Sequence, residues 1–195
     1  MTQALKLTFE EYLRLEPGSL PDGQFEYVDG ALKELPPEAQ PNIAIANYLF
    51  LLLVNAGIPF NLIYPHSCEV EVPVLQEGDP RTRFPDLVIL RQEHLALTQK
   101  RLTITREMPP PVLVAEVVSL GNANERRDYD RKREQYQELG VPEYWLINPA
   151  QQTIMVLAAQ TGVYREFGTF RGSEQISLQF PDLTLTAEQV LSAGA

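Results

Sequence analysis

The chain of 195 residues has one cysteine, two histidines and no long hydrophobic run. The single cysteine, Cys68, excludes an internal disulfide, and we expect no disulfide-linked partner. His66 and His94 leave no zinc site of the usual Cys and His spacing. The longest apolar stretch, residues 43–54, is shorter than the roughly 20 residues of a membrane-spanning helix, so we expect no association with a membrane.

Basic residues are scarce relative to acidic ones. Sixteen Lys and Arg against 26 Asp and Glu give a formal net charge of −10 and a pI near 4.7, which opposes non-specific attraction to a nucleic acid. Binding to DNA therefore needs a local basic patch. Five of the 16 basic residues fall within one short segment: Arg126, Arg127, Arg131, Lys132 and Arg133. A solvated helix face is the ordinary explanation of such a run, so charge alone decides nothing.

The rest of the composition is that of a globular protein. Hydrophobic residues make up 44% and charged residues 22% of the chain, which excludes the disordered, collagen-like and coiled-coil classes. A chain of this length buries about 70% of its extended surface on folding, and no linker rich in Gly or Ser divides it. We therefore expect one domain over residues 1–195. The first six residues lack the features of a secretory signal, which predicts a cytoplasmic protein.

Helix caps and turn residues define the elements of the N-terminal half. Thr8 and Glu11 form a capping box at a helix start, and Asp29-Gly30 suits a two-residue hairpin turn. A 3.6-residue apolar period that ends at Gly57 predicts a long helix. The predicted elements are a helix over 8–16, a hairpin of 24–28 with 31–35, the long helix after 36–38, and extended runs over 60–74 and 86–90.

The C-terminal half adds a buried strand, a second long helix and a meander. Residues 112–119 are nearly all β-branched or small and apolar, as in a strand covered on both faces. Gly140 ends the second helix at the usual left-handed cap position. The order predicts an α/β fold with a central mixed sheet flanked by helices and an antiparallel C-terminal annex. The other predicted elements are a short extended piece over 102–105, the helix over 124–139, strands over 143–148, 153–158, 163–170 and 175–179, and a capped helix over 186–191.

Two acidic residues occur where apolar strands are expected. Glu116 interrupts the strand over 112–119, and burial of an ionised carboxylate is costly unless a cation, a metal or hydrogen-bond donors compensate. Asp86 directly follows Pro85 at the head of an apolar run. A structural salt bridge or a turn at a strand end would explain each residue singly. Together, two such carboxylates are typical of a site for a hard divalent cation such as Mg²⁺ or Mn²⁺.

Lys132 lies on the helix stripe that is expected to face the sheet. Asp128, Lys132 and Tyr136 form a row with spacing i, i+4 and i+8, and this helix follows the Glu116 strand after a short loop. A helix packed back on that strand brings the Lys132 ammonium near Glu116. Metal-holding carboxylates beside a lysine suit phosphodiester hydrolysis, because the metal polarises the phosphate and the lysine stabilises developing negative charge. A surface lysine paired with Asp128 is the structural alternative.

His66 and Cys68 stand two positions apart in an extended run, so we expect their side chains on one strand face. As a nucleophilic or metal-binding pair they would need further ligands that the chain does not offer. We therefore interpret both as packing residues.

The residues discussed above resemble motifs of the PD-(D/E)XK nuclease superfamily, and within it the Uma-type family labelled "putative restriction endonucleases". The similarity spans residues 8–190 and implies a restriction-endonuclease-like core. The matching segments are 25–30, 84–89, 114–119, the row of Asp128, Lys132 and Tyr136, and 140–149.

The resemblance implies that Asp86 and Glu116 bind the metal and act in catalysis together with Lys132. The usual lysine of the superfamily, two positions beyond the glutamate, is absent because position 118 is Val118. A lysine on the following helix is the natural replacement in this family, and Lys132 holds that position.

Four further residues are candidates for a supporting role: Glu26, Asn42, Asp128 and Tyr136. Asn42 stands where family members often have a histidine, and an amide can hydrogen-bond a phosphate but cannot act as a base. Glu26 has an equally good structural explanation as a hairpin residue that faces solvent. The basic run implies contacts to the nucleic acid from Arg126, Arg127, Arg131 and Arg133.

The predicted activity is metal-dependent endonucleolytic hydrolysis of DNA phosphodiester bonds, with Mg²⁺ or Mn²⁺ as the cofactor. A homodimer is expected by analogy with restriction enzymes, since two-fold symmetry suits the cutting of both strands. Two alternatives stay open. A catalytically inactive member of the fold would act as a binding or assembly module, which the acidic composition and Val118 favour. The same carboxylates and lysine would also suit RNA or a nucleotide, because they act on the phosphate and not on the sugar.

Overall fold

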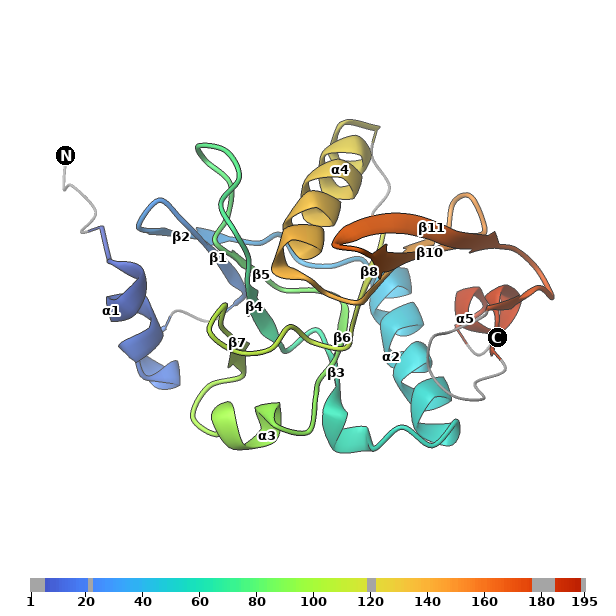
Figure 1. Cartoon of the computed structure of the whole chain (residues 1–195), viewed down its shortest axis with the longest axis horizontal. Coiled ribbons are helices and arrows are strands. Elements are labelled where there is room, and N and C mark those ends of the chain that lie inside the picture. The colour runs from blue at the N-terminus through green and yellow to red at the C-terminus, as the bar shows by residue number, and fades with distance from the viewer. Residues whose placement is uncertain (1–5, 21–22, 119–121, 177–184, 194–195) are drawn as a thin grey trace.

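The computed structural model describes residues 6–20, 23–118, 122–176 and 185–193, with the backbone only for residue 17 and residues 122–129 (Figure 1). Its central feature is a six-stranded sheet in the order β11-β10-β9-β8-β6-β3. β8 and β9 are parallel and the other neighbours are antiparallel, so the predicted mixed sheet is confirmed. The strands are β3 (Ile63–Pro65), β6 (Leu87–Ile89), β8 (Leu113–Val117), β9 (Glu143–Asn148), β10 (Thr153–Gln160) and β11 (Val163–Phe170).

The C-terminal antiparallel strands extend the central sheet directly. β10 pairs with β9 on one side and with β11 on the other, so the strands predicted as an annex are continuous with the core. A short pair of strands, β12 (Gln175–Ile176) and β13 (Leu185–Thr186), follows. Helix α5 (Ala187–Leu191) then begins at a capping box on Thr186, as predicted. Residues 177–179 of the predicted strand lie outside the described residues.

The two faces of the sheet are covered by different helices, and this decides where the strand side chains are directed. One set of alternate residues of β8 packs against α2 (Gln40–Asn55). Val114 belongs to the other set and lies in a second core cluster with Tyr136 of α4 (Asn122–Leu139). Figure 1 shows α4 and α2 on opposite sides of the central strands. Because Glu116 shares the strand face of Val114, its side chain is directed towards α4.

The N-terminal helix α1 (Phe9–Arg14) begins at the predicted capping box. The Thr8 hydroxyl accepts the backbone N–H of Glu11, and the Glu11 carboxylate accepts that of Thr8. The two buried aromatic residues of α1 pack on Tyr27 of the hairpin that follows. Aromatic packing therefore joins α1 to this hairpin.

The predicted hairpin is confirmed as β1 (Phe25–Val28) paired with β2 (Ala31–Glu34). Its two turn residues have positive φ angles, 49° at Asp29 and 88° at Gly30, as the two-residue turn requires. The turn sets the register of β1, and β1 positions Glu26.

We expect Gly30→Ala to lower the free energy of unfolding by about 2 kcal/mol, because a Cβ is strained at this φ. The new Cβ would also lie 3.0 Å from Lys6 Cβ and 3.2 Å from the Leu7 carbonyl oxygen. Gly57→Ala is the matched control, since Gly57 also has a positive φ but no atom within 4 Å of the added Cβ. Urea titration of both variants measures the difference, and equal losses would show that crowding at the hairpin turn has no effect.

A smaller sheet and several short elements lie beside the central sheet. The small sheet has the order β5-β4-β7 and comprises β4 (Glu69–Glu71), β5 (Thr82–Arg83) and β7 (Thr103–Ile104). The extended run predicted from residue 60 is wrong at its start, because Phe60–Leu62 form a 3-10 turn. The four-residue helix α3 (His94–Leu97) was not predicted, since one turn is too short to show a 3.6-residue period.

No helix in the described ranges is both long and apolar enough to cross a membrane. Cys68 is a free cysteine in the core, and burial raises the pKa of its thiol. Its side chain packs with residues of the small sheet and the central sheet. Cys68 is therefore a packing residue, as the sequence indicated.

Candidate active site

The strand register brings Asp86 and Glu116 to neighbouring positions. Leu87 of β6 pairs with Ala115 of β8 in an antiparallel ladder, and the next step of this ladder places Asp86 opposite Glu116. Side chains at such positions lie about 5 Å apart at their Cβ atoms. The backbone N–H of Val117 donates to Asp86 Oδ2 at 2.7 Å, which holds the first carboxylate against the second strand. Both acids line the same cavity, which has a volume of about 400 Å³.

Glu116 is buried, with 5% of its surface exposed, and each of its oxygens has a partner. Lys132 Nζ donates to Oε2 at 2.7 Å, and the Tyr136 hydroxyl donates to Oε1 at 2.9 Å. Burial raises the pKa of Glu116 to about 7, an effect that Lys132 opposes and the charge of Asp86 reinforces. The carboxyl group therefore changes its charge near neutral pH, and a cation placed between the two acids would favour its ionised form.

Helix α4 supplies both donors to Glu116 because Lys132 and Tyr136 are separated by one helical turn. The side chain of Lys132 is 19% exposed and lines the cavity, whereas Tyr136 is fully enclosed. The alternative partner of Lys132, Asp128, lies in the part of α4 whose side chains are outside the described residues. The structure thus brings Asp86, Glu116 and Lys132 together at the face of the sheet that α4 covers.

His66 is a site residue that sequence reasoning missed. Its Nδ1 lies 3.4 Å from Asp86 Oδ1, and its backbone N–H donates to the Asp86 carbonyl at 3.0 Å. The hydrogen bond to Asp86 raises the pKa of His66 although burial opposes this. The expected shared face with Cys68 is wrong, because β3 ends at Pro65 and His66 has a positive φ of 51°, which breaks the strand alternation. No local pattern could reveal this contact, since it joins segments that are separated in sequence.

Glu26 is buried and does not face solvent, so its structural explanation as an exposed hairpin residue is wrong. Its Oε1 accepts a hydrogen bond from Arg83 Nη1 at 2.9 Å, and both residues line the cavity. Arg83 was not singled out by the sequence analysis. It lies three positions before Asp86, in strand β5.

Asn42 contacts a residue of the cavity wall but does not line the cavity itself. Its Nδ2 donates to Glu38 Oε1 at 2.6 Å, and Glu38 lines the cavity whereas Asn42 does not. Glu38 contributes to the raised pKa of His66 after the larger effects of Asp86 and burial. Asn42 therefore positions an acidic side chain at the edge of the site.

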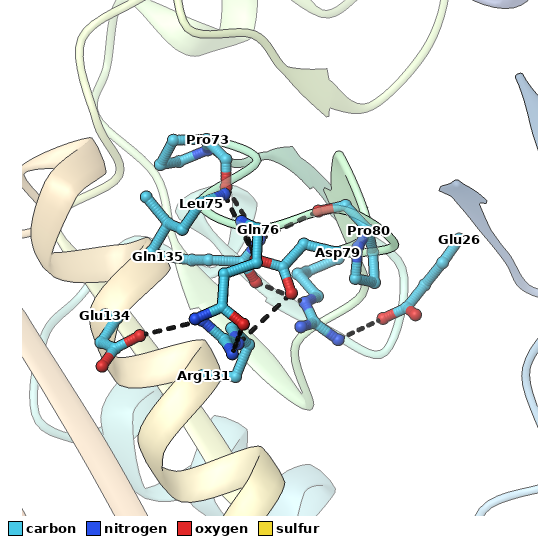
Figure 2. A network of polar contacts seen from close by, with 10 residues as sticks. Glu26, Pro73, Leu75, Gln76, Asp79, Pro80, Arg131, Glu134 and Gln135 are labelled. Carbon is cyan, nitrogen blue, oxygen red and sulfur yellow. Dashed lines mark hydrogen bonds and ion pairs between the residues drawn. The ribbon is translucent and has the colours of Figure 1, made fainter. Parts of the chain in front are cut away.

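The described basic residues of α4, from Arg131 to Arg133, do not share one face. Figure 2 shows Arg131 and Gln135 of α4 reaching the loop that contains Gln76 and Asp79. A solvated helix face, the ordinary explanation of the run, does not describe Arg131, because its Nε lies 3.3 Å from Asp79 Oδ1 and its Nη2 donates to Gln76 Oε1 at 2.6 Å. Arg133, in contrast, is exposed. The side chains of Arg126 and Arg127 lie outside the described residues.

The donor set at the site fits a magnesium-type ion. In the part of the chain whose side chains are described, no group of three or more His, Cys, Asp and Glu residues could hold a metal by itself. Asp86 and Glu116 nevertheless offer two neighbouring carboxylates in one cavity. Mg²⁺ is usually held by one or two carboxylates, while waters and substrate phosphates complete its shell. The chemistry of these donors therefore suits Mg²⁺ or Mn²⁺ and gives no support to a closed zinc site.

The family assignment follows from the sequence pattern that includes these residues. The pattern of the Uma2 family, described as "Putative restriction endonuclease", matches residues 9–188. The chain belongs to the Uma2 family. Its structure is similar to that of a protein described as a putative nuclease of DUF820 from Anabaena variabilis, with a TM-score of 0.67 and 16% sequence identity. The similarity covers 97% of this chain and 99% of that chain.

No curated protein matches this Uma2 member. The structural similarity shows that the fold is shared with that putative nuclease over nearly the whole chain. The family assignment confirms the resemblance inferred from the motifs around Asp86, Glu116 and Lys132. Family and fold together support a nuclease function at this general level.

Proposed function

We propose that this Uma2 protein is a metal-dependent endonuclease that hydrolyses DNA phosphodiester bonds. The single observation that supports this most is the meeting of Asp86, Glu116 and Lys132 in one cavity, with Lys132 Nζ 2.7 Å from Glu116. Two carboxylates and an amine at this spacing match the needs of phosphoryl chemistry, in which negative charge must be bound and then stabilised as it develops. The family description points to DNA as the nucleic acid.

Each residue has a distinct task in this proposal. Asp86 and Glu116 would hold Mg²⁺ or Mn²⁺, an ion that activates both the phosphate and a water molecule. Lys132 would contact a phosphate oxygen and stabilise the charge that builds up there, while its contact with Glu116 keeps the ammonium in place. Tyr136 and His66 are positioning residues, because each contacts one of the two carboxylates.

The test is a cleavage assay on plasmid DNA with Mg²⁺ or Mn²⁺ in wild type, Asp86→Asn and Lys132→Met. We expect wild type to cut only with the metal and both variants to lose at least about a hundredfold in rate, since one removes a proposed metal ligand and the other a charge at the phosphate. Asp130→Asn and Lys100→Met are matched controls, because both residues are exposed and neither lines the cavity. An RNA substrate in parallel distinguishes the two sugars.

Calorimetry with Mn²⁺ separates this proposal from the binding or assembly module. An enzyme must bind the ion through Asp86, so heat of binding should be present in wild type and absent in Asp86→Asn. Equal residual cleavage in wild type and both active-site variants would reject the assignment.

Elution volume on gel filtration tests the homodimer that we propose by analogy with restriction enzymes.

A further inference from the structure

The cavity contains a buried arginine that the proposed chemistry does not use. Arg83 has a side chain that is only 9% exposed, and it lines the cavity beside Asp86 and Glu116. Burial of a guanidinium is costly, so such a residue is retained only with good partners or a task. Its task is not evident from strand β5, which pairs through its backbone with β4.

The guanidinium is held rigidly from two sides. Its Nε donates to Gln135 Oε1 at 3.0 Å and its Nη1 donates to Glu26 Oε1 at 2.9 Å. Gln135 is itself fixed, because its Nε2 donates to the Pro73 carbonyl at 2.8 Å and to the Pro80 carbonyl at 2.9 Å. Figure 2 shows this network from Glu26 across the loop to α4. The orientation of the arginine is therefore set before any ligand enters.

Part of the guanidinium stays available. A guanidinium has five N–H donors, and the two contacts engage only Nε and Nη1. Nη2 has no hydrogen-bond partner among the described residues. It is also not one of the fully buried polar atoms without a partner, so part of its surface is accessible, and Arg83 lines the cavity. A fixed guanidinium nitrogen with two unengaged N–H groups beside a cavity is suited to an oxyanion.

The charge around the cavity makes a local donor necessary. The acidic lining residues outnumber the basic ones, so the average potential repels an anion. Although burial opposes the charged form, Glu26, and after it Tyr136 and Glu116, raise the pKa of Arg83. Arg83 therefore stays charged, and its charge interacts with that of Glu116, one of the two carboxylates proposed to bind the metal.

We propose that Arg83 forms a phosphate subsite beside the metal site, in which its Nη2 donates to a non-bridging oxygen of a phosphodiester. The subsite rests on the proposed function, because it assigns the cavity space beside the metal site to the DNA strand that the metal site would cleave. Glu26 orients Arg83 and also reduces its attraction for the phosphate. The ion pair thus adjusts the affinity of the subsite, and an ion pair with a purely structural role would have no such effect.

The test measures anisotropy of a short fluorescein-labelled DNA oligonucleotide with Ca²⁺ in place of Mg²⁺. We expect Arg83→Lys to raise the Kd about tenfold, because an ammonium keeps the charge but lacks the planar group that contacts Gln135 and Glu26 and so directs Nη2. Glu26→Gln should lower the Kd, since Arg83 is released from a competing anion, and an unchanged Kd would overturn the role of the ion pair in the subsite. Arg101→Lys is the matched control, because Arg101 pairs with the buried Glu69 and does not line the cavity.

Three outcomes of the oligonucleotide titration would overturn the subsite. They are an Arg83→Lys variant that binds within twofold of wild type, a Glu26→Gln variant that weakens binding as much as Arg83→Lys, and a wild type that binds no oligonucleotide. Competition by inorganic phosphate distinguishes a free anion from a phosphodiester, and an effect of Arg83→Lys on inorganic phosphate alone would also overturn it. Thermal melting shows that each variant is folded. Wild type that binds DNA but never cuts it would refute the proposed endonuclease and leave the subsite intact.

Discussion

Glu116→Gln is expected to lower the rate of metal-dependent DNA cleavage by at least about a thousandfold. The substitution keeps the shape of the side chain but removes the charge that would hold the metal and orient Lys132. A metal ion contributes several kcal/mol to stabilisation of the transition state, and each 1.4 kcal/mol corresponds to about tenfold in rate. The loss should appear in kcat, because the charge that must be stabilised develops only in the transition state.

Glu138→Gln is the control for this substitution, since Glu138 is exposed on the same helix as Lys132. It makes the same chemical change and should keep wild-type kcat. Single-turnover rates at saturating DNA separate the chemical step from binding. A Glu116→Gln variant that is folded and retains more than a tenth of wild-type kcat would show that Glu116 is not a metal ligand in the reaction.

The second large effect is a dependence of stability on pH that arises from Glu116. Its pKa rises from the ordinary value of 4.5 to about 7 in the folded protein, chiefly because of burial. Between these pH values the folded state binds the proton more tightly than the unfolded state does, so stability falls as pH rises. At about 1.4 kcal/mol per pH unit, the loss due to Glu116 is about 3 kcal/mol and is complete slightly above pH 7.

Urea unfolding of wild type and Glu116→Gln in EDTA, from pH 4 to 8, measures this effect. The difference in unfolding free energy between them should change by about 3 kcal/mol in favour of the variant as pH rises. The same difference for Glu138→Gln should stay nearly flat, because that side chain is exposed. A constant difference for Glu116→Gln would mean that Lys132 and Tyr136 fully compensate burial of the charge. Adding Mg²⁺ should reduce the slope for wild type, since the ion favours the ionised carboxylate.

Local sequence signals were sufficient for most of the secondary structure. The capping box at Thr8, the turn at Asp29-Gly30 and the cap at Gly140 depend on residues within one turn of each other. Such contacts depend on neighbouring residues and not on tertiary packing, which is why residue type alone predicts them. The short helix α3 and the 3-10 turn at Phe60–Leu62 lie below the length at which a period can be read.

The site was predictable where a residue contradicted its surroundings. An acid within an apolar strand and a lysine on a buried helix stripe imply a compensating partner, and this reasoning found Asp86, Glu116 and Lys132. His66 and Arg83 show no such contradiction. Each stands in a segment with ordinary composition, and its partner comes from another strand or from α4.

By itself, the sequence determined that Glu116 in an apolar strand needs a compensating partner, because burial of its charge alone is too costly, and it predicted Asp86 and Lys132 beside it. Only the tertiary structure decided which side chains complete the cavity. The β6–β8 register aligns Asp86 with Glu116, and the end of β3 at Pro65 turns His66 towards Asp86. Register and long-range packing depend on the summed contacts of the whole sheet, and no local pattern of residues contains that information.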